Sequence, residues 1–189
     1  MELFWRKGYS DTSVAELGAR TGLHRQAIYG DFGSKRKLFE AVLEHYRTSV
    51  TARRLSPLRE QAAGLAQLEA FFRQFRHAGA ATGGRLGCLM CLTAAEVSPH
   101  VPSVARIVSA YLGELRRLFR RVLGNARNRG EITAGIDLSQ AADYLTGSVL
   151  GLMALVRSPA PRAVIAHYVD GVLSSLHHLQ PERARAART

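Results

Sequence analysis

Three consecutive residues, Arg25, Gln26 and Ala27, follow a glycine in the stretch TGLHRQAIYGDF, residues 21–32. Arginine can make paired hydrogen bonds to O6 and N7 of guanine, and glutamine can make them to N6 and N7 of adenine. These side-chain types on one exposed helix face are what base reading requires. The alternative is a short core helix whose polar residues are simply solvated.

The residues around this stretch predict two short helices joined by a tight turn. Ser13, followed three positions later by Glu16, is a capping-box pattern that begins a helix at about Val14. Gly22 ends that helix, because glycine readily adopts the left-handed conformation of a sharp turn. With a second helix expected at about residues 24–30, the pattern predicts a helix-turn-helix, whose second helix enters the DNA major groove.

The apolar residues of this region can form a miniature core that leaves Tyr29 and the three residues Arg25, Gln26 and Ala27 facing outward. The expected core residues are Phe4, Val14, Leu17, Leu23, Ile28 and Phe32.

Composition agrees with a polyanionic partner. The chain of 189 residues carries a formal net charge of +11, and for a helical protein this favours nucleic acid. It has no apolar run long enough to span a membrane and no signal-peptide pattern at its start, so we expect a soluble, cytoplasmic protein with no membrane partner.

The sequence predicts neither catalysis nor a bound metal or cofactor. Cys88 and Cys91 have no second pair and no histidine cluster, which argues against a disulfide framework and a zinc site. His177 and His178 are adjacent on a predicted helix and cannot easily face one metal. We find no nucleophile–base–acid set and no phosphate-binding glycine loop, so we do not expect an enzyme.

Apolar residues recur at helical spacing throughout, and strand-like alternation is not sustained anywhere, so the predicted fold class is all-α. Glycine and proline breaks, Pro57 among them, leave about nine helices. The first three are short, which predicts a small N-terminal unit attached to a larger helical body.

The N-terminal residues resemble a known family. The stretch GYSDTSVAELGARTGLHRQAIYGDFGSKRKLF is similar to the DNA-binding module of the TetR family of bacterial repressors, and the match covers residues 1–46. The resemblance places Arg25, Gln26 and Ala27 nearest the bases. The resemblance also implies that Tyr29 and Lys35 contact DNA phosphates, and that the helix start at Thr12 and Ser13 lies against a phosphate. A helix N-terminus and donors of these types suit that role, although Lys35 could also be an ordinary charged helix start.

Two positions depart from the family pattern. His24 stands where the family commonly has a serine-like N-cap, so the second helix is expected to be less well capped, or His24 itself contacts DNA. The family also usually has a basic arm and two further turns before the residues that open this chain. The resemblance therefore predicts a longer native N-terminus and weak anchoring of the short first helix.

The resemblance assigns residues 47–180 to a ligand-binding and dimerisation domain, followed by a flexible tail at 181–189. Two apolar helices near the C-terminus would pair with those of a second copy in a homodimer. Gly147 and Gly151 leave a smooth strip for such an approach, although the same strip could serve the core of one chain. The expected interface residues are Tyr144, Gly147, Gly151, Ala154, Tyr168 and Val172.

An effector pocket is expected among the middle helices, although residues of these types are more often plain core. The candidate lining residues are Phe71, Phe75, Cys88, Met90, Glu96, Tyr111, Leu112 and Met153. Glu96 could pair with a cationic ligand or with a nearby arginine. Cys88 could be a reactive thiolate that senses electrophiles or oxidants, or an inert buried cysteine.

These features together predict a transcriptional regulator, most simply a repressor, that binds a palindromic operator on double-stranded DNA as a homodimer and is released by a small molecule. The rival hypothesis is a helical dimer that binds a small molecule or a protein and has lost DNA binding through the shortened first helix.

Overall fold

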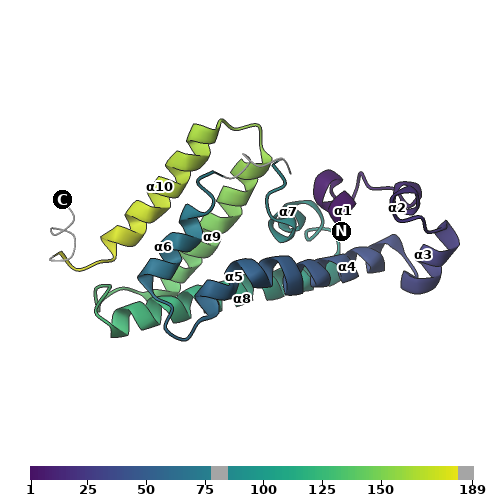
Figure 1. The fold of residues 1–189 in the computed structure, drawn as a ribbon. Coiled ribbons are helices and arrows are strands. Elements are labelled where there is room, and N and C mark those ends of the chain that lie inside the picture. Colours follow the sequence, from purple (N-terminus) through teal and green to yellow (C-terminus); the bar gives the residue numbers. More distant parts are fainter. Residues whose placement is uncertain (78–84, 183–189) are drawn as a thin grey trace. The chain divides into compact units, whose positions relative to one another are not determined.

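The computed structural model describes residues 1–77 and 85–182, and all the regular secondary structure within these ranges is helical (Figure 1). The helices are α1 (Glu2–Lys7), α2 (Val14–Thr21), α3 (Arg25–Phe32), α4 (Lys35–Tyr46), a π-helical turn η1 (Arg47–Thr51), α5 (Ala52–Arg59), α6 (Leu65–Arg73), α7 (Leu89–Glu96), α8 (Pro102–Asn128), α9 (Leu138–Arg157) and α10 (Arg162–His178). The all-α prediction is confirmed.

The helix α4, the turn η1 and the helix α5 follow one another without a break, so residues 35–59 form one continuous helical run. Counted as one element, this run makes nine helices among the described residues, the number that the sequence predicts. The predicted break at Pro57 is wrong, because Pro57 lies inside α5. The φ angle that proline imposes is compatible with a helix, and the missing N–H removes one helical hydrogen bond. The helix α5 ends two residues after Pro57.

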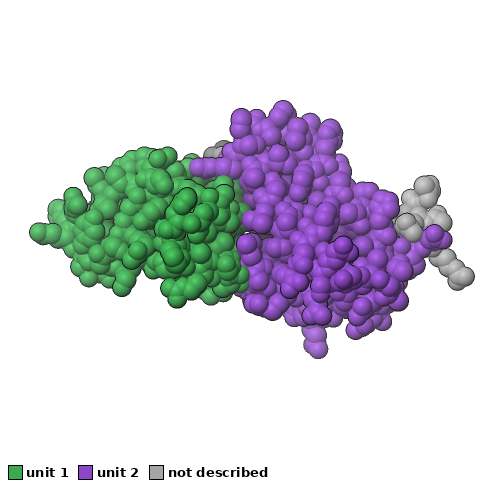
Figure 2. All heavy atoms as spheres, turned by 180° about the vertical axis from the view of Figure 1, so that it is seen from behind, with its two compact units in different colours: residues 1–53, 86–111 green, residues 54–85, 112–189 purple. Residues whose placement is uncertain are grey.

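The chain divides into two compact units (Figure 2). The first unit contains residues 1–53 and 86–111, and the second contains residues 54–85 and 112–189. Residues 86–111, which include α7, therefore group with the N-terminal helices although they lie far along the chain. The predicted division into 1–46, 47–180 and 181–189 stays a prediction, and most of that tail lies outside the described residues.

Aromatic side chains from α1 and α4 form the core of the first unit. Phe4 is fully buried, and its ring centroid lies 4.9 Å from that of Phe39. The ring centroid of Tyr9 lies 4.8 Å from Phe39 as well, and that of Trp5 lies 5.0 Å from Tyr46. The six residues of α1 are thus anchored on α4 by two aromatic contacts, which is firmer than the short helix alone predicts.

The second unit is built from α5, α6, the C-terminal part of α8, α9 and α10. The helix α10 packs against both α6 and α9 (Figure 1). Phe71, Phe72 and Phe119 meet in the core, with ring centroids 5.2–6.1 Å apart. Among the described residues, no helix is both long enough and apolar enough to span a membrane.

Candidate nucleic-acid interface

The start of α2 has the predicted capping box. The Ser13 hydroxyl accepts a hydrogen bond from the Glu16 amide at 3.2 Å, and the Glu16 carboxylate accepts one from the Ser13 amide at 2.9 Å. Lys7 also donates to this carboxylate. The Lys7 hydrogen bond, together with those from Ser13, lowers the pKa of Glu16 to about 2, so the box is charged at any physiological pH.

The turn between α2 and α3 follows from two glycines. Gly22 has φ of +72°, in the left-handed region, and ends α2 as predicted. Gly18, which no sequence pattern indicates, is needed for a different reason. A β-carbon at this position would lie 2.7 Å from the carbonyl oxygen of Leu23, so only glycine lets the turn pack this closely on α2.

Three buried residues hold the two helices together: Leu17, Ile28 and Phe4. Val14 and Phe32 are half-buried. The prediction that Leu23 belongs to this core is wrong, because 43% of Leu23 is exposed. Its carbonyl, rather than its side chain, faces α2.

The predicted base-reading residues lie on the exposed side of α3. Arg25, Gln26 and Ala27 are all exposed and occupy the first turn of the helix. His24 is the N-cap and makes no side-chain capping hydrogen bond, as its departure from the family pattern predicts. The first turn of α3 therefore presents backbone N–H groups and the positive end of the helix dipole, a suitable environment for a phosphate.

Two half-buried side chains flank this turn. The guanidinium carbon of Arg25 lies 5.4 Å from the ring centroid of Tyr29. Lys35, at the start of α4, donates to the Ser10 carbonyl at 3.4 Å, and its ammonium lies 4.4 Å from the ring centroid of Tyr9. These contacts restrict the lysine side chain while leaving donors for a further acceptor, because an ammonium has three.

Thr12 does not face solvent. Its side chain is fully buried, and its hydroxyl donates to the Gly8 carbonyl at 2.7 Å. The predicted phosphate contact at the start of α2 therefore depends on backbone and on Ser13, which is exposed. Thr12 instead stabilises the turn that leads into α2.

The residues predicted to line an effector pocket are divided between the two units. Cys88, Met90, Glu96 and Tyr111 belong to the first unit, whereas Phe71, Phe75, Leu112 and Met153 belong to the second. Six of the eight are buried, and Glu96 and Leu112 are half-buried. The single effector pocket formed by all eight stays a prediction.

Within the described part of the chain, Glu96 has backbone groups as partners and no arginine. Its carboxylate accepts hydrogen bonds from the backbone amides of Tyr9, at 3.3 Å, and Ser10, at 2.9 Å. Sequence spacing could not reveal this contact, because the partners are backbone groups 86 and 87 positions away.

The two cysteines are buried and are not joined by a disulfide. Cys88 is the N-cap of α7, and its sulfur lies 3.9 Å from the Tyr111 hydroxyl. Hydrogen bonding from the Cys91 side chain lowers the pKa of the Cys88 thiol to about 6, opposed by burial. Burial raises the pKa of Tyr111. Cys88 thus has the thiolate character of a reactive cysteine, but it has the burial of an inert one.

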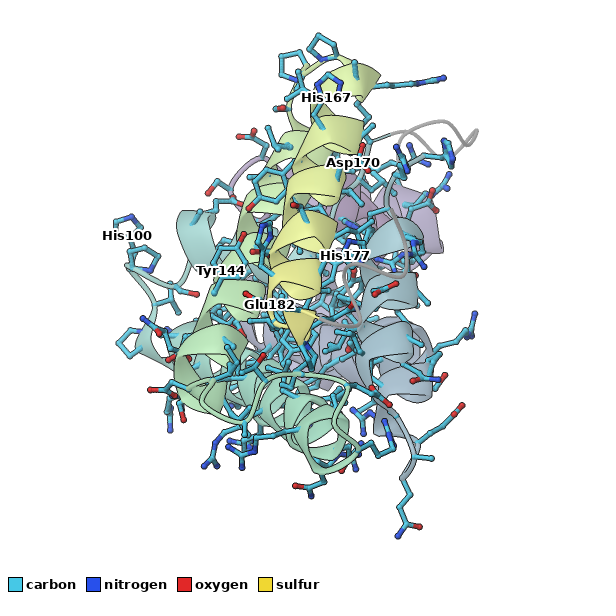
Figure 3. The ribbon with its side chains drawn as sticks, turned by 90° about the vertical axis from the view of Figure 1, so that its left-hand side faces the viewer. His100, Tyr144, His167, Asp170, His177 and Glu182 are labelled. Atoms are coloured by element: carbon cyan, nitrogen blue, oxygen red, sulfur yellow. The ribbon has the colours of Figure 1, made fainter. Side chains whose placement is uncertain are left out.

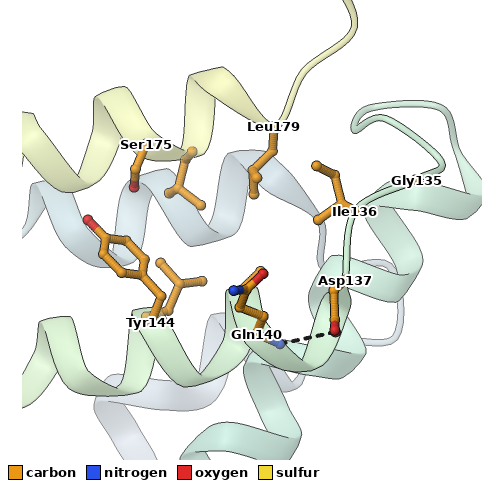
Figure 4. Close-up of a pocket in the computed structure, with 10 residues that line it drawn as sticks. Gly135, Ile136, Asp137, Gln140, Tyr144, Ser175 and Leu179 are labelled. Atoms are coloured by element: carbon orange, nitrogen blue, oxygen red, sulfur yellow. Dashed lines mark hydrogen bonds between the residues drawn. The ribbon is translucent and has the colours of Figure 1, made fainter.

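A groove of about 560 Å³ lies between α9 and α10 in the second unit (Figure 4). Its lining residues are Gly135, Ile136, Asp137, Gln140, Ala141, Tyr144, Leu145, Ser175, Leu176 and Leu179. Tyr144, with 52% of its surface exposed, comes from the predicted interface set. It lies on the opposite side of α10 from Asp170 and His177, whose partners are on or just after α6 (Figure 3).

The predicted interface residues differ in what they contact. Gly147 and Ala154 are exposed on α9, and a β-carbon at Gly147 would meet nothing within 4 Å. At Gly151, by contrast, a β-carbon would lie 2.7 Å from the Tyr168 hydroxyl of the same chain. Gly151 and Tyr168 therefore pack α9 against α10, and Val172 is buried in the monomer.

Comparison with known proteins agrees with this geometry. Residues 1–42 match the family model described as bacterial regulatory proteins, tetR family, and residues 64–171 match that of a tetracyclin repressor-like C-terminal domain. The chain is 27% identical over 161 residues to the HTH-type transcriptional repressor ComR of Escherichia coli, covering 85% of this chain and 77% of ComR.

Two further similarities extend over most of the chain. The uncharacterized HTH-type transcriptional regulator YezE of Bacillus subtilis is 28% identical over 177 residues, which are 93% of this chain and 91% of YezE. A cysteine mutant of the TetR family regulator CifR, solved with 26-bp double-strand operator DNA, superposes with a TM-score of 0.80. The two sequences are 26% identical, and the similarity covers 92% of this chain and 91% of the CifR chain.

The chain belongs to the TetR family, and it is a DNA-binding transcriptional regulator.

Proposed function

We propose that the protein is a repressor that binds a palindromic operator as a homodimer and leaves it when a small molecule binds. The observation that carries this proposal is the first turn of α3, where Arg25, Gln26 and Ala27 are exposed and no side chain caps the helix start. Tyr29 and Lys35 flank that turn as phosphate donors. Arg25 and Gln26 read base edges, and the flanking donors set the orientation of the helix on the duplex.

Exposed residues on α9 and α10 support the homodimer. Tyr144, Gly147 and Ala154 leave one side of α9 open, and Val164 on α10 is 41% exposed. A two-fold axis through this face would pair the same residues from both copies. In a two-fold dimer of this class the two reading helices enter successive major grooves, about 34 Å apart, so the operator would have two inverted half-sites.

Repression and operator binding are supported by the relatives. ComR carries the description of a transcriptional repressor, and CifR was solved on its operator. An effector can release DNA only by binding the DNA-incompetent arrangement more tightly than the DNA-bound one. Moving the population from 1:99 to 99:1 requires a preference of roughly 10⁴-fold.

The test of this proposal is the stoichiometry and symmetry of the complex. Sedimentation of the protein with its isolated operator is expected to show two chains on each duplex. Replacing one half-site with random sequence should weaken binding steeply, since one α3 would then lose its base contacts. One chain on each duplex, with equal affinity for the intact and the half-replaced site, would contradict the homodimeric reader.

A further inference from the structure

The turn between α1 and α2, residues 8–13, has no regular secondary structure of its own, yet it leads directly into the DNA-binding helices. We call it the α1–α2 turn. Its backbone is held from two directions: Thr12 donates to the Gly8 carbonyl, and the Glu96 carboxylate accepts from the amides of Tyr9 and Ser10. Glu96 is the last residue of α7, so a distant part of the chain fixes the geometry of this turn.

The turn is shaped to receive this carboxylate. Gly8 has φ of +86°, a conformation that favours glycine. A β-carbon at Gly8 would lie only 2.8 Å from Oε2 of Glu96. The conformation favours glycine here, and any side chain at position 8 would have to displace the Glu96 carboxylate from the turn.

The same turn also holds Lys35. The Ser10 residue that donates its amide to Glu96 accepts from the Lys35 ammonium through its carbonyl at 3.4 Å. Tyr9, whose amide also faces Glu96, places its ring 4.4 Å from that ammonium. Moving the Tyr9–Ser10 backbone would therefore move both groups that restrain Lys35.

We propose that Glu96 is a positioning residue for DNA binding: its carboxylate fixes the Tyr9–Ser10 backbone and, through it, the Lys35 ammonium that contacts a DNA phosphate. The inference rests on the proposed phosphate contact of Lys35. It gives α7 a direct mechanical connection to the DNA-binding helices, because any change that withdraws Glu96 releases the lysine from its restraints.

The effect of Glu96 on charge and its effect on position have opposite signs. Removing a carboxylate from a protein surface near DNA reduces repulsion of the phosphates, so neutralisation alone strengthens binding. Loss of the amide contacts frees the turn and weakens binding. Glu96→Ala removes the charge and both contacts, whereas Glu96→Gln removes the charge and keeps one acceptor oxygen, which can hold the shorter contact with the Ser10 amide while its NH2 group faces the Tyr9 amide.

The experiment measures the dissociation constant for duplex DNA across a series of salt concentrations. Glu96→Ala is expected to weaken binding about tenfold, because a charge-assisted hydrogen bond is lost. The salt slope, which is the slope of log affinity against log salt concentration, should fall in magnitude by about 1. Glu96→Gln should bind more tightly than Glu96→Ala, because it keeps the Ser10 contact and lacks the repulsive charge. The double variant Glu96→Ala with Lys35→Ala should lose about tenfold, rather than the hundredfold expected of independent residues.

Glu131→Ala is the matched control. Glu131 accepts from the Leu65 amide at 2.8 Å and pairs with Arg129, so it makes contacts of the same kind in the second unit. Its removal should lower the melting temperature without weakening DNA binding. If Glu96→Ala does not fold, Glu96→Asp replaces it, because the aspartate keeps the charge and withdraws the carboxylate by one methylene. A smaller loss of affinity is then expected.

Two results would overturn the proposal. One is a folded Glu96→Ala, or Glu96→Asp in its place, that binds as tightly as the unmodified protein. The other is a set of losses from Glu96 and Lys35 that simply add. The measurements are made on a random duplex at low salt as well as on the operator, since a phosphate contact acts on both. Failure to find any operator would therefore contradict the proposed function alone and leave this test decisive.

Discussion

The guanidinium of Arg25 lies over the ring of Tyr29, 5.4 Å from its centroid, one turn further along α3. The contact holds the arginine against the helix surface at its first turn and reduces the rotamer freedom that would be lost on binding. We expect Arg25→Ala to cost about 1 to 3 kcal/mol of binding free energy on the operator and to relax the base preference at one position in each half-site. Binding to a panel of single-base operator variants measures this.

Lys35→Ala provides the contrasting case. A phosphate contact carries no base information, so this change should weaken operator and random DNA alike and lower the salt slope by about 1. Titration of both duplexes at several salt concentrations checks the expectation.

Equal losses on operator and random DNA for Arg25→Ala would remove Arg25 from the base-reading role.

Ser13→Ala should destabilise the first unit. It removes the hydroxyl that accepts from the Glu16 amide, and loss of an N-cap of this kind costs about 1 kcal/mol. Thermal unfolding followed by circular dichroism measures the change, with Ser13→Thr as the control that retains a capping hydroxyl. An unchanged melting temperature for Ser13→Ala would show that the capping box contributes nothing to stability.

The lowered pKa of the Cys88 thiol should make the free energy of unfolding depend on pH. Its pKa is lowered to about 6 in the folded protein, chiefly by the Cys91 side chain, so above pH 6 the unfolded chain binds more protons than the folded one. The free energy of unfolding should therefore rise from about pH 6 towards the ordinary thiol pKa near 9, and this contribution is lost as the pH falls through 6. Urea unfolding at several pH values measures it.

The control for that series is Cys88→Ser, which has no thiol to titrate. Its stability should show a weaker rise than the unmodified protein over the same pH range. Parallel curves for the two proteins would mean that the buried thiol stays protonated in the folded state.

Gly147→Arg tests the dimer face. Nothing in the chain lies within 4 Å of a β-carbon at this position, so the monomer should fold, while two added cations would meet across the two-fold axis. We expect a monomer by sedimentation and weakened operator binding. Ala66→Arg, which adds the same charge at an exposed site on α6, is the control. A dimeric Gly147→Arg would place the interface elsewhere.

The features that depend on local sequence were predictable. The capping box of Ser13 and Glu16, the left-handed Gly22 and the poorly capped His24 each depend on a few neighbouring residues, and the structure agrees with all three. The exposed face of α3 followed from helical spacing alone.

The features that depend on distant contacts were not predictable. Glu96 reaches backbone amides that any sequence would supply, and Gly151 is required by the Tyr168 hydroxyl on the next helix. Leu23 is apolar, yet close packing of its carbonyl on Gly18 leaves the side chain outside. Helical periodicity identifies which residues are buried within a helix, but it does not identify what they contact.

The central claim is that the protein reads a two-fold operator, and selection of bound sequences from a random duplex pool at moderate salt tests it most directly. We expect a palindrome with half-sites about one helical turn apart, recovered by the unmodified protein, with a changed preference for Arg25→Ala. Recovery of no preferred sequence, or of one lacking two-fold symmetry, would contradict the claim.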